Sequence, residues 1–249
     1  MNTEKYRSFF ETVGAENGWD FSKVKNQVEG RSWDFQEEVI SRCRPSDIIL
    51  DIGTGGGEVA LAYAPSVTLL VGIDYAHGMI GTARCNAVAS GRENVRFLPM
   101  DAEKLEFPAG FFDLVSCRQA PFDAREVHRV LTDGGTFLTQ QVSEADKINI
   151  KEKFGRGQNY GVADGTERDA LIHSLRDAGF KTVEVFEYDA VDIYQTPEDL
   201  LFLLKHTPIL IDFGRDPEDF ETFKKLIEEN RCGHGIKTNE KRYMLIARK

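Results

Sequence analysis

The sequence predicts an α/β fold with a doubly wound, mostly parallel sheet, and three observations support this prediction. Residues 48–52 form an apolar run that is typical of a strand buried on both faces, and it leads into a loop with glycine at positions 53, 55 and 57. Further apolar runs then alternate with helical patterns as far as residue 142. Polar residues follow the ends of several runs, where open parallel sheets bind their ligands.

The composition is that of a folded protein. The 249 residues are 41% hydrophobic and 29% charged, and the net charge is −10. One α/β domain with an added cap fits this length. The acidic balance argues against a broad nucleic-acid surface, which needs clustered Lys and Arg. No apolar run is long enough for a transmembrane helix and no signal-peptide pattern is present, so we expect a cytoplasmic protein with no membrane partner.

Cysteine and histidine spacing indicates no metal site. The four cysteines form no Cys-x-x-Cys pair, and the five histidines form no His-Glu-x-x-His motif. Reduced thiols are the norm in a cytosolic protein. We therefore expect free thiols and no bound metal.

The first 44 residues are expected to form a helical cap segment ahead of a main domain that spans residues 45–249. Apolar residues recur at helical spacing from Tyr6 to Val13, and a second helix is expected to begin after Asp34 and end before Pro45. Both tryptophans, Trp19 and Trp33, lie in this segment. They either anchor it to the core or contact a ligand.

The main domain should alternate strands and helices. Strands are expected at residues 48–52, 67–73, 95–98, 112–117, 136–142, 183–194 and 242–247. A helix up to Tyr63 should follow the glycine loop. Glycines between residues 143 and 165 predict a mobile loop with at most a short helix. Residues 195–240 should form a helical insertion that caps the site or widens the flank of the sheet, because Thr196-Pro197 and Asp216-Pro217 are strong helix starts.

The spacing of the glycines in the loop indicates which nucleotide cofactor would bind at the ends of the strands. A dinucleotide fingerprint requires Gly-x-Gly-x-x-Gly, but the sixth position counted from Gly53 is Glu58, and no P-loop lysine is present. Instead Asp51 precedes Gly53, Gly55 and Gly57. This order disfavours an oxidoreductase that uses a nicotinamide cofactor.

Polar residues also end the next three strands. Asp74 follows the second strand, where a carboxylate can accept both hydroxyls of a ribose. Asp101 follows the third and can accept a hydrogen bond from an adenine amino group, with the Ala102 N–H beside a ring nitrogen. Arg118 and Gln119 follow the fourth.

Together these segments resemble the successive signatures of class I S-adenosylmethionine (SAM)-dependent methyltransferases, and among them the type 11 methyltransferase-domain family. The likeness covers residues 45–142 and includes Glu126–Gly135, which is similar to that family's Glu-x-x-Arg-Val-Leu-Lys-Pro-Gly-Gly. It implies a Rossmann-like seven-stranded sheet with the last strand antiparallel, and SAM as the cofactor, released as S-adenosylhomocysteine (SAH). The residues that it implies for cofactor binding are Asp51, Gly53, Thr54, Gly55, Gly57, Asp74, Tyr75, Met79, Asp101, Ala102, Glu103, Cys117 and Arg118.

From this resemblance we expect a SAM-dependent methyltransferase that acts on a small-molecule acceptor. Trp33, Gln119 and Phe122 are the expected acceptor contacts. Many relatives carry histidine where this chain has Gln119, which cannot act as a general base, so no catalytic residue is assigned. Two alternatives stay open: methylation of RNA or protein, and a non-catalytic module that binds SAM or SAH.

Overall fold

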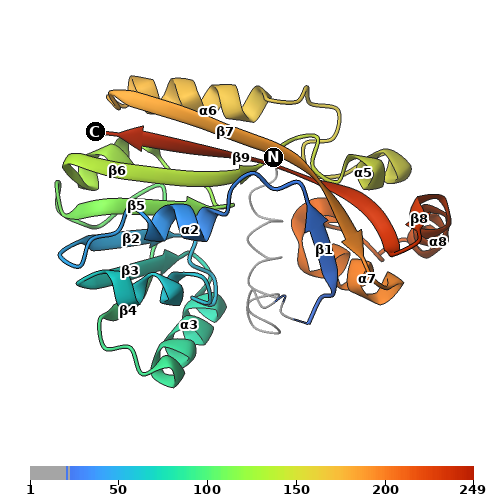
Figure 1. Cartoon of the computed structure of the whole chain (residues 1–249), viewed down its shortest axis with the longest axis horizontal. Helices are drawn as coiled ribbons and strands as arrows, with labels where there is room; N and C mark the ends of the chain where they lie inside the picture. Colours follow the sequence, from blue (N-terminus) through green and yellow to red (C-terminus); the bar gives the residue numbers. More distant parts are fainter. Residues whose placement is uncertain (1–20, 22) are drawn as a thin grey trace.

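The computed structural model describes residue 21 and residues 23–249, which form a layered α/β sheet that continues into a second lobe (Figure 1). The strands lie in the order β1-β7-β9-β6-β5-β2-β3-β4, and β8 pairs with β9. The parallel strands are β2 (Ile48–Ile52), β3 (Leu69–Asp74), β4 (Val95–Pro99), β5 (Phe112–Arg118) and β6 (Leu131–Val142). The last strand, β9 (Gly235–Arg248), runs antiparallel between β6 and β7 (Thr182–Tyr194). The seven predicted strands and the antiparallel last strand are therefore confirmed, and β1 and β8 bring the sheet to nine strands.

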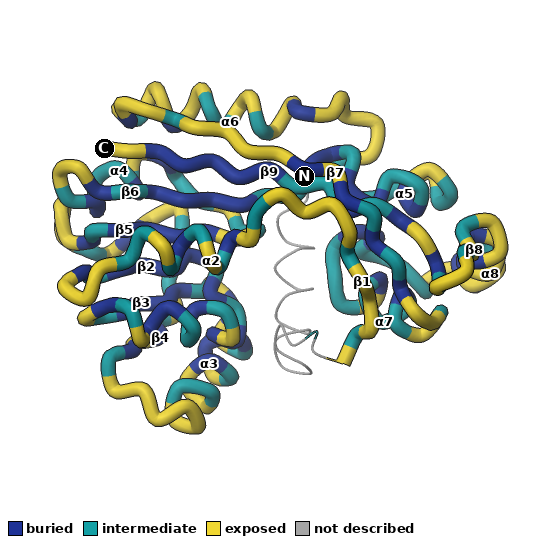
Figure 2. Tube along the Cα trace, viewed as in Figure 1, coloured by how far each residue is buried: buried dark blue, intermediate teal, exposed yellow. Residues whose placement is uncertain are grey.

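Helices cover both faces of this sheet. One face carries α2 (Phe35–Ile40), α3 (His77–Ser90) and the short 3-10 turns η1 (Ala60–Ala62) and η2 (Ala64–Ser66); the other carries α4 (Ala124–Val130) and α6 (Thr166–Asp177). Ile49 of β2 packs with the first group and its neighbour Leu50 with the second, because successive side chains of a strand point to opposite faces. The central strands are accordingly buried on both sides (Figure 2).

The segment after the glycine loop differs from the expected helix. It forms η1 and η2 instead of one α-helix up to Tyr63. Ala60 and Tyr63, both fully buried, are three residues apart, which is the repeat of a 3-10 helix. Pro65 then removes the donor that a longer helix would need.

The N-terminal segment contains a strand that the sequence pattern did not indicate. β1 (Asn26–Glu29) pairs antiparallel with Val191–Tyr194 of β7. Its residues are mostly exposed and show no apolar alternation, so only the pairing reveals it. The predicted α2 is present, and the Asp34 side chain accepts a hydrogen bond from the Glu37 N–H at 3.0 Å. The helix expected at Tyr6–Val13 and Trp19 lie outside the described residues.

The insertion forms a second lobe with its own core. We define this lobe as α5 (Ile148–Phe154), α7 (Pro197–His206), η3 (Pro208–Leu210), α8 (Glu218–Asn230), β8 (Arg231–Cys232), β1 and the adjoining ends of β7 and β9. Its core side chains include Ile150, Leu200, Phe223 and Ile236. The helix start predicted at Thr196 is present, and Thr196 forms a capping box with Asp199. The last strand begins at Gly235 and not at residue 242, so part of the expected insertion is strand.

Buried charges connect the second lobe to the sheet. The Lys147 ammonium lies 2.6 Å from the Asp192 carboxylate, and the two side chains are 2% and 1% exposed. Lys147 also donates to the Asn239 carbonyl at 2.9 Å. These contacts, together with α5, anchor the 143–165 segment that the sequence predicted to be a mobile loop. No helix in the part of the chain that the structure describes is long and apolar enough to cross a membrane.

We predict that Lys147→Met lowers the free energy of unfolding by about 3–5 kcal/mol, because the substitution leaves the buried Asp192 carboxylate without its counter-charge. The control is Lys153→Met. Its partner Glu229 is 56% exposed, so the loss should stay below about 1 kcal/mol. Urea denaturation measures both, and equal losses would contradict a structural role for the buried pair.

Candidate functional site

The turn after β2 brings the backbone close to its neighbours. Gly53, Gly55 and Gly57 have φ angles of +71°, +56° and +79°, a region that favours glycine. A Cβ added at Gly53 would lie 2.2 Å from the Cβ of Ala120, so no side chain fits there. The Gly53 and Thr54 N–H groups both donate to the Ile73 carbonyl at 2.9 Å. The turn is therefore fixed against the end of β3.

Asp51 lies beneath this turn and is only 6% exposed. Burial raises the pKa of its carboxyl to about 6, although a 2.6 Å hydrogen bond from the Ser116 hydroxyl opposes the shift. The Thr54 hydroxyl, also buried, lies close enough to Asp51 to lower this pKa in the same direction as Ser116. A cation bound at this turn would stabilise the ionised form of Asp51.

The acids after β3 and β4 lie at neighbouring strand ends, as predicted. Asp74 pairs with Pro99 in the parallel ladder, and its backbone carbonyl accepts the Met100 N–H. The Asp74 carboxylate accepts the N–H groups of Gly55 and Ala76, both at 2.9 Å. Asp101 is exposed, and its carboxylate accepts the Glu103 N–H at 2.9 Å. The Asp74 carboxylate thus orders the glycine loop, and the Asp101 carboxylate is exposed at the next strand end.

The other residues predicted to bind the cofactor differ in accessibility. Tyr75 is 44% exposed beside Asp74. Met79 and Cys117 are 2% and 0% exposed, and the Cys117 thiol donates to the Ala120 carbonyl. These two side chains belong to the core. Ala102 is half-buried against the core.

A polar cavity of about 110 Å³ lies beyond the end of β5. It is lined by Arg31, Trp33, Asp34, Phe35, Gln36, Arg118, Gln119, Gln140, Tyr188, Glu240 and Arg242. The structure therefore brings Trp33 and Gln119, which were predicted to contact the acceptor, together with Arg118, which was predicted to contact the cofactor. Phe122 is not among the lining residues, because its ring packs edge-to-face on Phe137 at 4.8 Å. Asp51, Asp74 and Asp101 do not line this cavity either.

Several residues that line the cavity were not predicted from the sequence. Arg31 donates two hydrogen bonds to Glu240, at 2.8 and 2.9 Å, and the Tyr188 hydroxyl donates a third at 2.6 Å. Burial opposes ionisation of Glu240, yet the bonds from Arg31 and the nearby Arg242 charge lower its pKa to about 2. Glu240 is thus a poor proton acceptor. Polar residues alternate here along β9, a pattern that ordinarily indicates a solvent-facing strand.

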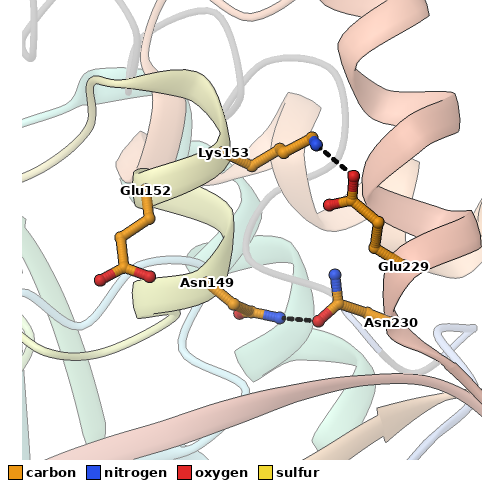
Figure 3. Close-up of a pocket in the computed structure, with 5 residues that line it drawn as sticks. All are labelled: Asn149, Glu152, Lys153, Glu229 and Asn230. Atoms are coloured by element: carbon orange, nitrogen blue, oxygen red, sulfur yellow. Dashed lines mark hydrogen bonds and ion pairs between the residues drawn. The ribbon is translucent and has the colours of Figure 1, made fainter.

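A larger hollow, of about 360 Å³, lies between α5 and α8 on the second lobe (Figure 3). Its side chains bond to one another: Lys153 pairs with Glu229, and the Asn149 amide donates to Asn230 at 2.8 Å. The carboxyl ends of the parallel strands contribute nothing to it. We therefore place the functional site at those strand ends.

The residues at the strand ends fit SAM. Carboxylates follow β3 and β4, where a ribose and an adenine amino group need acceptors. The buried Asp51 suits the cationic methionine part, and the glycine turn leaves room for close approach of a ligand. The chemistry of this donor and acceptor set is the one that the family resemblance implies.

Comparison with known proteins agrees with this assignment. Residues 49–135 match the family described as methyltransferase domain. The uncharacterised methyltransferase YcgJ of Bacillus subtilis is 41% identical over 105 residues, which are 39% of this chain and 42% of YcgJ. Its crystal structure has a TM-score of 0.61 at 24% identity and covers 86% of this chain and 97% of that chain.

Two relatives carry named reactions. A malonyl-[acyl-carrier protein] O-methyltransferase of Geobacter sulfurreducens is 33% identical over 59% of this chain and 60% of its own length. A ubiquinone/menaquinone biosynthesis C-methyltransferase of Coxiella burnetii is 27% identical over 73% of this chain and 85% of its own length. The chain spans less than two thirds of the first curated relatives that it matches. The matched segment contains the glycine turn, Asp74 and Asp101, so residues 49–135 of this chain are similar to a methyltransferase domain.

Proposed function

We propose that the protein transfers the methyl group of SAM to a small-molecule acceptor that binds beside Arg118 and Gln119. The observation that carries this proposal is the adjacency of two sites: a loop and acids suited to SAM at the ends of β2, β3 and β4, and a polar cavity beyond β5. The relatives include an O-methyltransferase and a C-methyltransferase. The acceptor atom therefore does not follow from the likeness to them.

The chain's own contribution would be binding, alignment and exclusion of water. Bound SAM supplies a methyl group on a sulfonium, which is already activated for in-line displacement. Asp74 would hold the ribose, Asp101 and Ala102 the adenine, and Asp51 the cationic end. Glu240 is committed to Arg31 and Tyr188, so we assign it no role in proton removal. In this mechanism the rate enhancement comes from holding the acceptor in line with the methyl group and from excluding water.

A methyl-transfer assay tests this proposal against its two alternatives. SAM with a labelled methyl group is incubated with the protein and, separately, with small metabolites, RNA and an acyl-carrier protein. Label in a small molecule supports the proposal, whereas label in RNA or protein supports macromolecular methylation. The net charge of −10 disfavours RNA. Tight SAM or SAH binding with no transfer to any of them would instead indicate a binding module.

Asp74→Ala should weaken SAM binding by about 1–3 kcal/mol, because the ribose loses a charged acceptor and the Gly55 N–H loses its partner. Isothermal titration calorimetry measures the change. The control is Asp133→Ala, which removes an exposed carboxylate near the start of β6 and should leave the Kd unchanged. An unchanged Kd in Asp74→Ala would refute the ribose assignment.

The affinity for SAM should fall as the pH drops below about 6. Asp51 must be ionised to favour the cationic ligand, and its pKa in the unliganded protein is about 6. Lowering the pH from 7 to 5 should therefore weaken binding about tenfold, since a proton must leave before the ligand binds. In Asp51→Asn the affinity should be weaker at pH 7 and nearly independent of pH over this range. A wild-type profile that is flat between pH 7 and 5 would place Asp51 outside the site.

A further inference from the structure

Four side chains that line the polar cavity have hydrogen-bonding groups without a partner among the described residues. They are Trp33, Arg118, Gln119 and Gln140. The Trp33 indole N–H is fully buried and can only donate. Arg118 makes no ion pair with any residue that the structure describes. Gln140 is 5% exposed and the Trp33 N–H is buried, whereas Arg118 is exposed. Because buried polar groups in proteins are normally satisfied, the Trp33 and Gln140 groups point to a missing ligand group.

The carboxylates around the cavity already accept hydrogen bonds. Glu240 takes two hydrogen bonds from Arg31 and one from Tyr188, and Arg242 is paired with Asp146. The Asp34 carboxylate caps α2. The cavity therefore has a surplus of donors together with the positive charge of Arg118. A group that accepts several hydrogen bonds and carries negative charge would satisfy both.

The size and position of the cavity restrict what this group belongs to. About 110 Å³ equals the volume of about four water molecules, which suits a carboxylate or phosphate but not a whole substrate. The lining residues come from β5 and the residue after it, from β6, β7 and β9, from the start of α2, and from the segment that crosses from β1 to α2. The acids assigned to the adenosine follow β3 and β4, on the other side of β2. The cavity thus lies on the acceptor side of the sheet.

We propose that this cavity is an anion subsite, in which Arg118 and the donors of Trp33, Gln119 and Gln140 bind a carboxylate or phosphate of the methyl acceptor. This assignment rests on the proposed function. It means that the acceptor is an acidic metabolite whose charged group occupies the cavity and orients the molecule toward the cofactor. SAM has a carboxylate of its own on the methionine part, so a test must separate the two sources.

Fluorescence of Trp33 provides that test. The chain has two tryptophans, and Trp19→Phe leaves Trp33 as the single reporter. Malonate and inorganic phosphate are titrated at constant ionic strength, once with saturating SAH and once with saturating 5′-methylthioadenosine, which lacks the amino-acid carboxylate. Calorimetry first establishes SAH binding, so that failure of the proposed function is seen separately. We expect saturable binding of malonate or phosphate with both nucleosides, and no response to chloride.

Arg118→Gln in the same background should weaken anion binding about tenfold or more, because a charge-assisted hydrogen bond is lost. Its thermal unfolding midpoint should stay close to the wild-type value, since the Arg118 side chain makes no hydrogen bond or ion pair with a described residue. Arg215→Gln is the matched control. It removes the same charge from a side chain that is 78% exposed on the second lobe and should leave anion binding intact.

Three results would overturn the proposal. Absence of saturable anion binding would show that the cavity is no subsite. Binding with 5′-methylthioadenosine but not with SAH would assign the cavity to the cofactor's own carboxylate. Equal weakening of anion binding in Arg118→Gln and Arg215→Gln would show that binding depends on the net charge of the protein and not on the cavity. If anions bind but SAH does not, the assignment to a methyl acceptor falls together with the proposed function.

Discussion

The hydrogen bonds that hold the turn after β2 against β3 are the constraint on which the site depends. The Ile73 carbonyl accepts two consecutive N–H groups of the turn, and the Asp74 carboxylate accepts a third from Gly55. The turn can follow this path because its glycines adopt positive φ angles. The same contacts therefore set the shape of the loop and the position of the Asp74 carboxylate.

The two halves of the site are built in different ways. The cofactor half comes from loops after short parallel strands, as in other open α/β sheets. To the proposed acceptor half, the long antiparallel strands β7 and β9, which continue into the second lobe (Figure 1), add side chains beside those that end β5 and β6. Their inward positions carry Tyr188, Glu240 and Arg242, held by ion pairs and hydrogen bonds.

The parallel half of the fold could be predicted from the sequence because each strand is a continuous apolar run and each run ends at a polar residue. The rest depended on tertiary pairing. The polar segment Asn26–Glu29 becomes a strand only because β7 offers an edge. Glu240 alternates with polar neighbours, which ordinarily indicates exposure, yet it is buried. Cys117 and Phe122 lie near the end of β5 as predicted, but side-chain direction could not be inferred and both face the core.

A crystal structure of the SAH complex tests most directly whether consecutive strand ends form one cofactor site. We expect the Asp74 carboxylate within hydrogen-bonding distance of the ribose hydroxyls and Asp101 beside the adenine amino group. We also expect the homocysteine part over the glycine turn, with the cavity beyond β5 left for the acceptor. SAH bound elsewhere, or a ribose held by other residues while Asp74 contacts only the backbone, would contradict it.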